Sequence, residues 1–132
     1  MICLDSDFMI ALLRGNEQAK AKVKILEEAS KELVSTAINA LELYTGIIAV
    51  DGVSGKRIES TRDFLSNLTI LPLDVSSAER SAYILNTLKK IGKPIGLKDS
   101  LIAGIALEHK ADILTRNVKH FELVPGLKIE EW

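Results

Sequence analysis

Cysteine, aromatic residues and long apolar runs are scarce in this chain, and each scarcity excludes a class of protein. A lone cysteine, Cys3, leaves no internal disulfide and no cysteine-based zinc site, so a reducing cytoplasm is the expected compartment. No run approaches the roughly 18 apolar residues of a membrane span, and Asp5 and Asp7 interrupt the N-terminal apolar stretch, so neither membrane segment nor signal peptide is expected. One tryptophan, two tyrosines and three phenylalanines offer few platforms for stacked nucleic-acid bases.

The length and the balance of charge favour one ordinary globular domain. The 132 residues are 47% apolar and 27% charged, which is enough to bury one sizeable core, and we expect a single domain over residues 1–132. Because the net charge is -1, a nucleic acid would have to bind a local basic patch. Arg14, Lys98, Arg116 and Lys119 are candidates for that patch, although any surface carries such residues.

Short β-rich runs alternate with helical stretches along the chain, which predicts an α/β fold with a mostly parallel sheet of about five strands and helices on both faces. The expected strands are Ile2–Asp5, Leu33–Ser35, Thr69–Leu73, Asp112–Thr115 and Lys128–Glu130. The expected helices are Phe8–Leu13, Glu17–Ala29, Thr36–Val50, Ser54–Asn67, Ser76–Ile91 and Asp99–Lys110, with a short turn at Val118–Phe121. The expected N-caps are Asn16, Ser35 and either Asp74 or Ser76.

The stretch Thr36–Val50 is apolar almost all round. Such a helix is either enclosed by its own domain or shared with a second chain, so a homodimer is one interpretation of this stretch.

Acidic residues fall at the ends of the apolar segments or inside them. Asp5 ends the first strand, Glu42 interrupts the apolar helix, and Asp99 opens the helix before the fourth strand, which Thr115 and Asn117 follow. A carboxylate in apolar surroundings costs several kcal/mol unless it is paired or binds a cation. Ligands of open α/β sheets bind beyond the carboxyl ends of the strands, so we expect these residues to converge on one cation site.

Helix capping is the structural alternative for most of these residues. Asp5 and Asp99 stand where helices begin, and Thr115 and Asn117 suit the start of the following turn. Glu42 has no such explanation, because Leu41 and Leu43 flank it within a helix. Mg²⁺ and Mn²⁺ prefer oxygen ligands and assist attack on phosphodiesters. Hydrolysis of a phosphodiester is therefore the chemistry that these residues suit best.

Four segments, in this order and spacing, resemble the signatures of the PIN domain, and most closely the VapC-type ribonuclease toxins of prokaryotic toxin–antitoxin pairs. The segments are Leu4-Asp5-Ser6-Asp7, Ala40-Leu41-Glu42-Leu43-Tyr44, Ile95-Gly96-Leu97-Lys98-Asp99-Ser100-Leu101-Ile102-Ala103 and Leu114-Thr115-Arg116-Asn117-Val118-Lys119-His120-Phe121. The resemblance covers essentially the whole chain. It implies a three-layer α/β/α PIN-like domain and an Mg²⁺- or Mn²⁺-dependent endoribonuclease that is homodimeric and inhibited by a small antitoxin protein.

The same resemblance implies roles for individual residues. Asp5, Glu42 and Asp99 would bind the metal, while Thr115 and Asn117 would position these ligands or the attacking water. The chain departs from the family pattern in two places: His120 stands where a fourth acid is frequent, and Asp7 where asparagine is common. His120 and Asp7 are therefore additional candidate ligands, which leaves occupancy by one or two metal ions open.

Two other functions fit parts of the sequence. One is a catalytically silent PIN-like binding module, held in a complex by its apolar helix and binding metal weakly because of His120. The other is a haloacid-dehalogenase-type phosphatase, whose pair of acids two residues apart resembles Asp5 and Asp7. The chain is short for that fold with its usual cap, and it lacks that family's paired late acids. A nucleotide-binding Rossmann domain is disfavoured because no glycine-rich loop follows the first strand.

Overall fold

The five expected strands form one parallel sheet in the computed structural model, which describes residues 1–53 and 55–132. Neighbouring strands follow the order β3-β2-β1-β4-β5. In register, Cys3 lies opposite both Val34 and Ile113. The strands are β1 (Ile2–Leu4), β2 (Leu33–Thr36), β3 (Thr69–Leu71), β4 (Asp112–Leu114) and β5 (Ile129–Glu130).

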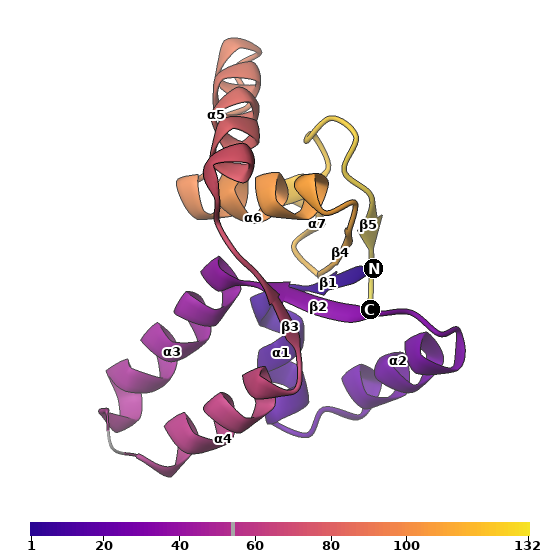
Figure 1. The fold of residues 1–132 in the computed structure, drawn as a ribbon, viewed down its shortest axis with the longest axis vertical. Coiled ribbons are helices and arrows are strands. Elements are labelled where there is room, and N and C mark those ends of the chain that lie inside the picture. Colours follow the sequence, from indigo (N-terminus) through magenta and orange to yellow (C-terminus); the bar gives the residue numbers. More distant parts are fainter. Residues whose placement is uncertain (54) are drawn as a thin grey trace.

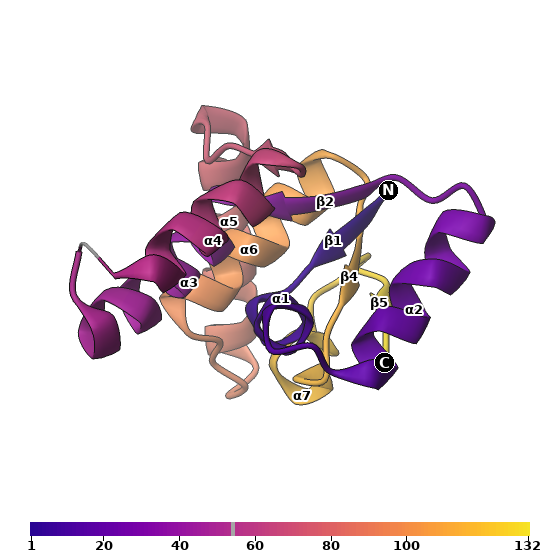
Figure 2. The same cartoon turned by 90° about the horizontal axis from the view of Figure 1, so that it is seen from below.

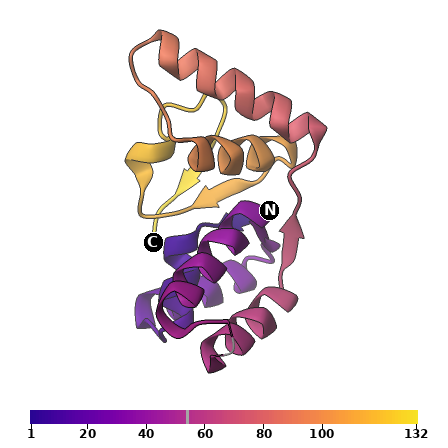
Figure 3. The same cartoon turned by 90° about the vertical axis from the view of Figure 1, so that its left-hand side faces the viewer.

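Helices cover both faces of this sheet, so the expected three-layer architecture is confirmed (Figure 1). One layer contains α1 (Ser6–Leu13), α2 (Glu17–Glu28), α3 (Ala37–Asp51) and α4 (Lys56–Ser66). The other contains α5 (Val75–Lys90), α6 (Leu97–Glu108) and α7 (Val118–Phe121). Figure 3 shows the same two layers on either side of the strands, and Figure 2 views the sheet from the side of the α1–α4 layer. None of the helices in the described ranges is long and apolar enough to cross a membrane.

Alternation along the strands builds one hydrophobic core on each face of the sheet. Successive strand side chains point to opposite faces. Ile2 and Leu4 accordingly pack with Phe8 and the α1–α4 layer, whereas Cys3 and Ile113 pack with the α5–α7 layer. Burial on both faces explains why the strands are continuously apolar in sequence. Burial also raises the pKa of the Cys3 thiol to about 12, so this cysteine stays protonated and packs as a small apolar residue.

The expected element ends needed several corrections. Thr36, not Ser35, caps α3, because its side chain accepts a hydrogen bond from the Asn39 N–H. Helix α6 begins at Leu97, which places Asp99 in its first turn rather than at its first residue. Helix α4 begins at Lys56, and Ser54 of its expected range lies outside the described residues. The other expected ends differ from the observed ends by about two residues at most. Differences of this size are usual, because helices and strands fray at their ends.

Two of the expected caps are confirmed. The Asn16 side chain accepts from the Ala19 N–H at the start of α2. Asp74 forms a reciprocal capping box with Ser77 at the start of α5. Both motifs were readable from sequence because a cap depends only on residues within one turn.

Helices α5 and α6 pack closely, and this contact fixes the segment that carries Asp99. Gly104 of α6 faces α5, where a Cβ atom would lie 2.1 Å from Ser81 Oγ and 2.8 Å from the Ser77 carbonyl oxygen. Ser81 and Ser77 are themselves buried. A side chain at position 104 would therefore push α6 away from α5.

Gly104→Ala should lower the free energy of unfolding by about 1–3 kcal/mol, the usual cost of overpacking a core. Gly46→Ala is the matched control, because within residues 1–53 and 55–132 a Cβ built at Gly46 in α3 would meet no atom within 4 Å beyond its chain neighbours and the backbone of its own helix. The control should raise stability by about 0.5–1 kcal/mol, since alanine favours a helix over glycine. Urea denaturation of both variants measures the difference, and equal stabilities would contradict the close packing.

Candidate active site

Four elements deliver the expected site residues to the carboxyl edge of the sheet. Asp5 follows β1, and Thr115 follows the adjacent β4. Glu42 projects from the second turn of α3, and Asp99 from the first turn of α6. The parallel strands alone bring Asp5 and Thr115 together, whereas Glu42 and Asp99 depend on where the two helices cross that edge.

Asp5 is the buried centre of this arrangement. Its carboxylate accepts hydrogen bonds from the Ser6 N–H at 2.9 Å, from Asn39 Nδ2 at 2.8 Å and from Thr115 Oγ1 at 2.7 Å. The residue is 5% exposed. The hydrogen bond from Ser6 also makes Asp5 the N-cap of α1. Capping the helix and belonging to the candidate site are therefore compatible roles of this side chain.

Burial dominates the ionisation of Asp5. Desolvation raises the pKa of its carboxyl above the usual value, against the hydrogen bonds from Thr115 and Ser6, which lower it. The neighbouring negative charges of Asp7 and Glu42 raise this pKa further. The folded protein therefore holds a negative charge at Asp5 at a cost in stability, and a cation nearby would reduce that cost.

A hydrogen-bonded chain that sequence analysis missed connects Asp5 with Glu42. Asn39 Nδ2 donates to Asp5 and, at 3.0 Å, to Ser6 Oγ, and this hydroxyl donates to Glu42 Oε1 at 2.8 Å. Thr36 Oγ1 donates to Asn39 Oδ1 at 2.7 Å, which fixes the orientation of the amide. Asn39 is fully buried, and an asparagine three residues before Glu42 in an apolar helix was the signal that could have revealed it.

Asp99 lies at the more exposed side of the site, paired with His120. Asp99 Oδ2 is 3.0 Å from His120 Nδ1. Desolvation raises the pKa of the Asp99 carboxyl, His120 opposes this shift, and the charge of Glu42 adds to it. Glu42 Oε2 in turn lies 3.4 Å from Lys98 Nζ. Each of these two acids therefore faces an exposed cationic or basic side chain.

Asp7 holds the backbone after β4. One of its oxygens accepts from the Phe8 N–H at 2.6 Å and the other from the Arg116 N–H at 2.8 Å. The Arg116 guanidinium lies 3.5 Å from the centre of the Trp132 ring and donates to Gln18 Oε1. Arg116 is thus occupied by protein contacts, which disfavours its expected role in an RNA-binding patch.

Thr115 and Asn117 differ in how they reach the site. Thr115 is fully buried and donates its hydroxyl to Asp5, while the same oxygen accepts from the Asn117 N–H at 2.9 Å. Asn117 thus joins this series of hydrogen bonds through its backbone N–H, and the residue itself is exposed. The loop after β4 positions Asp5 through Thr115.

The donor set fits a hard divalent cation. The negative charge of Glu42 raises the pKa of both Asp5 and Asp99, and carboxylate oxygens are the ligand type that such a cation prefers. Within residues 1–53 and 55–132, however, no group of three His, Cys, Asp or Glu side chains is close enough to hold a metal ion. The pairs with Lys98 and His120 take up the negative charge instead, and both partners are exposed enough to move.

Comparison with known proteins agrees with this arrangement. The sequence model of the PIN domain matches residues 2–127. The chain belongs to the PIN domain family. It is 47% identical to ribonuclease VapC1 of Haemophilus influenzae strain R2866, over 98% of this chain and 96% of that protein. It is 27% identical to the tRNA(fMet)-specific endonuclease VapC of Shigella flexneri, over 98% and 96% of the two chains.

A solved structure also resembles this chain. A chain in the toxin–antitoxin complex from Klebsiella pneumoniae superposes with a TM-score of 0.74 at 26% identity, covering 96% of this chain and 95% of that one. The order and spacing of the PIN-like segments therefore identified the family correctly. Membership in this family leaves no support for the haloacid-dehalogenase alternative.

Replacing Asp5 with asparagine tests the buried charge of this PIN domain. Because the pKa of Asp5 is raised in the folded protein, protonation of Asp5 adds to the free energy of unfolding. This contribution is fully present below the pKa of the unfolded chain, about 3.9, and is lost as the pH rises through the folded pKa. Asp5→Asn should therefore unfold at higher denaturant than wild type at pH 7, with the difference shrinking toward pH 4.

Urea denaturation between pH 4 and pH 8 in EDTA measures this effect. Asp63→Asn on α4 is the matched control, because Asp63 is exposed and takes no part in the hydrogen bonds to Asp5, and it should change stability by less than about 0.5 kcal/mol. An Asp5→Asn variant that is less stable than wild type at pH 7 would show that the charge at Asp5 is not costly.

Proposed function

We propose that this chain is a divalent-metal-dependent endoribonuclease and the toxin of a toxin–antitoxin pair. The observation that carries the proposal is Asp5, a nearly buried carboxylate held by three hydrogen bonds beside two further acids. A scaffold that accepts the cost of such a charge is typical of a catalytic site. The 47% identical relative is named a ribonuclease, which supports RNA as the substrate.

Asp5, Glu42 and Asp99 would hold the cation, Mg²⁺ or Mn²⁺. When bound, it would supply a positive charge that orients water and stabilises the developing charge on the phosphate. The protein's contribution is to orient the ligands: Asn39 and Thr115 fix Asp5, and Ser6 fixes Glu42. Such outer contacts commonly affect metal affinity or activity by about 10–100-fold.

Asp99 and Glu42 are the acids more open to an attacking water. Their side chains are 27% and 26% exposed, whereas Asp5 is 5% exposed. Thr115 and Asn117 would act indirectly: the Thr115 hydroxyl orients Asp5, and the Asn117 N–H orients that hydroxyl.

The two additional candidate ligands receive different roles. Asp7 would position the loop after β4, because both of its oxygens accept backbone N–H groups. His120 would orient Asp99 through Nδ1, and it would join the metal ligands only if this contact opened.

Asp99→Asn should reduce RNA cleavage in Mn²⁺ or Mg²⁺ by at least about 100-fold, because it removes a ligand and not merely a supporting contact. The assay compares a mixed-sequence RNA and initiator tRNA, with either metal and with EDTA. The tRNA is included because the Shigella flexneri relative is named for tRNA(fMet).

Asp63→Asn again provides the control, and cooperative thermal unfolding of Asp99→Asn shows that the fold is intact. Full activity in Asp99→Asn would remove this residue from the site. Wild-type protein that neither binds Mn²⁺ nor cleaves either RNA would instead favour the silent binding module.

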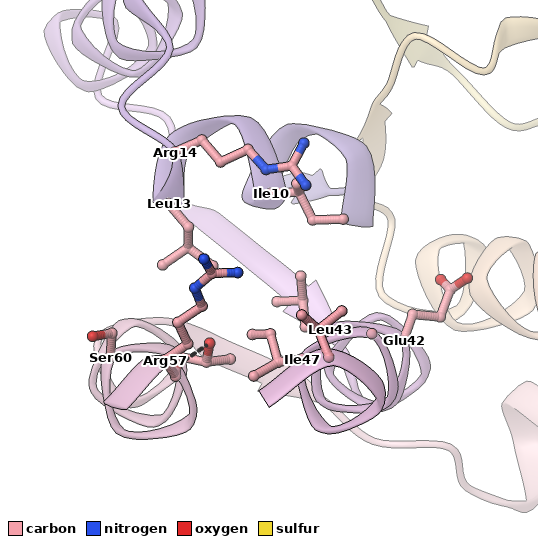
Figure 4. Close-up of a pocket in the computed structure, with 11 residues that line it drawn as sticks. Ile10, Leu13, Arg14, Glu42, Leu43, Ile47, Arg57 and Ser60 are labelled. Atoms are coloured by element: carbon pink, nitrogen blue, oxygen red, sulfur yellow. Dashed lines mark hydrogen bonds between the residues drawn. The ribbon is translucent and has the colours of Figure 1, made fainter. Parts of the chain in front are cut away.

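An apolar groove beside the site suits the proposed antitoxin partner. It has a volume of about 480 Å³ and lies between α1, α3 and α4. Figure 4 shows Ile10, Leu13, Leu43 and Ile47 around it, with Glu42 at one end. An amphipathic helix from a partner would bury its apolar face in such a groove. A partner seated there would reach the acidic site through Glu42.

Val50 tests this groove, because it lines the groove and is 75% exposed. Val50→Glu should weaken the complex with a co-purified antitoxin by about tenfold or more, since a charge would be buried against apolar side chains. Val75→Glu is the matched control, because Val75 is 86% exposed at the start of α5. Equal antitoxin affinity of both variants, measured by calorimetry, would place the partner elsewhere.

Two further predictions accompany this function. The homodimer stays a prediction, and α3 still favours it, since Leu41 and Ile48 of this helix are exposed on the single chain. A cytoplasmic location stays a prediction as well, in keeping with an RNA substrate.

A further inference from the structure

A second cleft, distinct from the apolar groove, is lined in part by Asp99. It has a volume of about 520 Å³ and lies between the α5–α6 connection and α7. This volume falls within the range of about 300–1,000 Å³ that is usual for small-ligand pockets. Its lining includes the paired side chains of Asp99 and His120, together with Lys93, Ile95, Lys119 and Leu123.

The cleft is basic although the chain as a whole is not. Residues 89–98 contain Lys89, Lys90, Lys93 and Lys98 and no acid, against a net charge of -1 for the chain. Lys93 and Lys119, one on each wall, are exposed. A polyanion that approached Asp99 from this side would therefore meet two cations before it met the acids.

Lys93 and Lys119 also differ from the other cations around the site. Lys98 contacts Glu42, and Arg116 contacts Trp132 and Gln18. Among the ion pairs found in residues 1–53 and 55–132, none involves Lys93 or Lys119. These two lysines can therefore bind an incoming phosphate without breaking a contact in the protein.

Aliphatic side chains also line the cleft. Ile95 is half-buried, and Leu123 is 46% exposed. Aliphatic side chains beside paired ammonium groups suit a ligand with a flat apolar face and negative charges at its edge, as a nucleotide has. An acidic protein segment would match the lysines, but it would not need a pocket that is continuous with the catalytic acids.

We propose that this cleft is a nucleotide subsite, in which Lys93 and Lys119 contact RNA phosphates next to the scissile bond while Ile95 and Leu123 contact the base or ribose. The subsite rests on the proposed ribonuclease function. It would hold the strand in register with Asp99 and would not depend on bound metal, because its contacts are with the RNA backbone.

The test is RNA binding by the double variant Lys93→Gln, Lys119→Gln in the full chain. Fluorescence anisotropy with a labelled single-stranded RNA in EDTA gives the affinity between 50 and 200 mM salt. Loss of two phosphate contacts should weaken binding by roughly tenfold or more at 50 mM salt and reduce the slope of log K against log salt by about 1.4. Mn²⁺ affinity, measured by calorimetry, should be unchanged.

The matched control is Lys31→Gln, Lys128→Gln, which removes two exposed lysines at the opposite edge of the sheet, where β2 and β5 begin. Wild-type RNA affinity and salt slope in the Lys93, Lys119 variant would overturn the subsite while leaving the ribonuclease intact. An equal loss in both double variants would show a general effect of charge and would also overturn it. A wild-type chain that neither binds nor cleaves RNA would overturn the proposed function itself.

Discussion

The organisation of this protein depends on keeping one carboxylate charged inside the fold. Asp5 is nearly buried, and an unpaired charge there would cost several kcal/mol. Three donors, the Ser6 N–H, Asn39 and Thr115, compensate for the lost water, and they come from the start of α1, from α3 and from the end of β4. The same bonds that stabilise the charge therefore join three elements at one edge of the sheet.

The burial of Asp5 is only partly compensated, and this explains why stability and function oppose each other here. Hydrogen bonds from Thr115 and Ser6 lower the pKa of Asp5, yet desolvation and the negative charges of Asp7 and Glu42 outweigh them. A protein selected for stability alone would place a neutral residue at this position. The residual repulsion is what gives the proposed site its preference for a cation.

The packing of the two helical layers sets how the proposed site meets other molecules. Helices α1, α3 and α4 leave an apolar groove on one side of Glu42, whereas the α5–α6 connection and α7 leave a basic cleft beside Asp99. Because Gly104 lets α6 lie directly against α5, the segment that carries Asp99 is held by the core and not by a flexible loop. The groove proposed for the protein partner and the cleft proposed for RNA therefore lie beside different acids, Glu42 and Asp99.

The sequence by itself determined the alternation of strands and helices, the family, and the set of acids, because periodicity, caps and short motifs depend on residues close together in the chain. It also determined that Asp5 and Thr115 follow strands. It did not determine that Asn39 and Ser6 link Asp5 to Glu42, or that Arg116 is held by Trp132 and Gln18. Those contacts join residues 16 to 98 positions apart, so only the packing of helices against the sheet decided them.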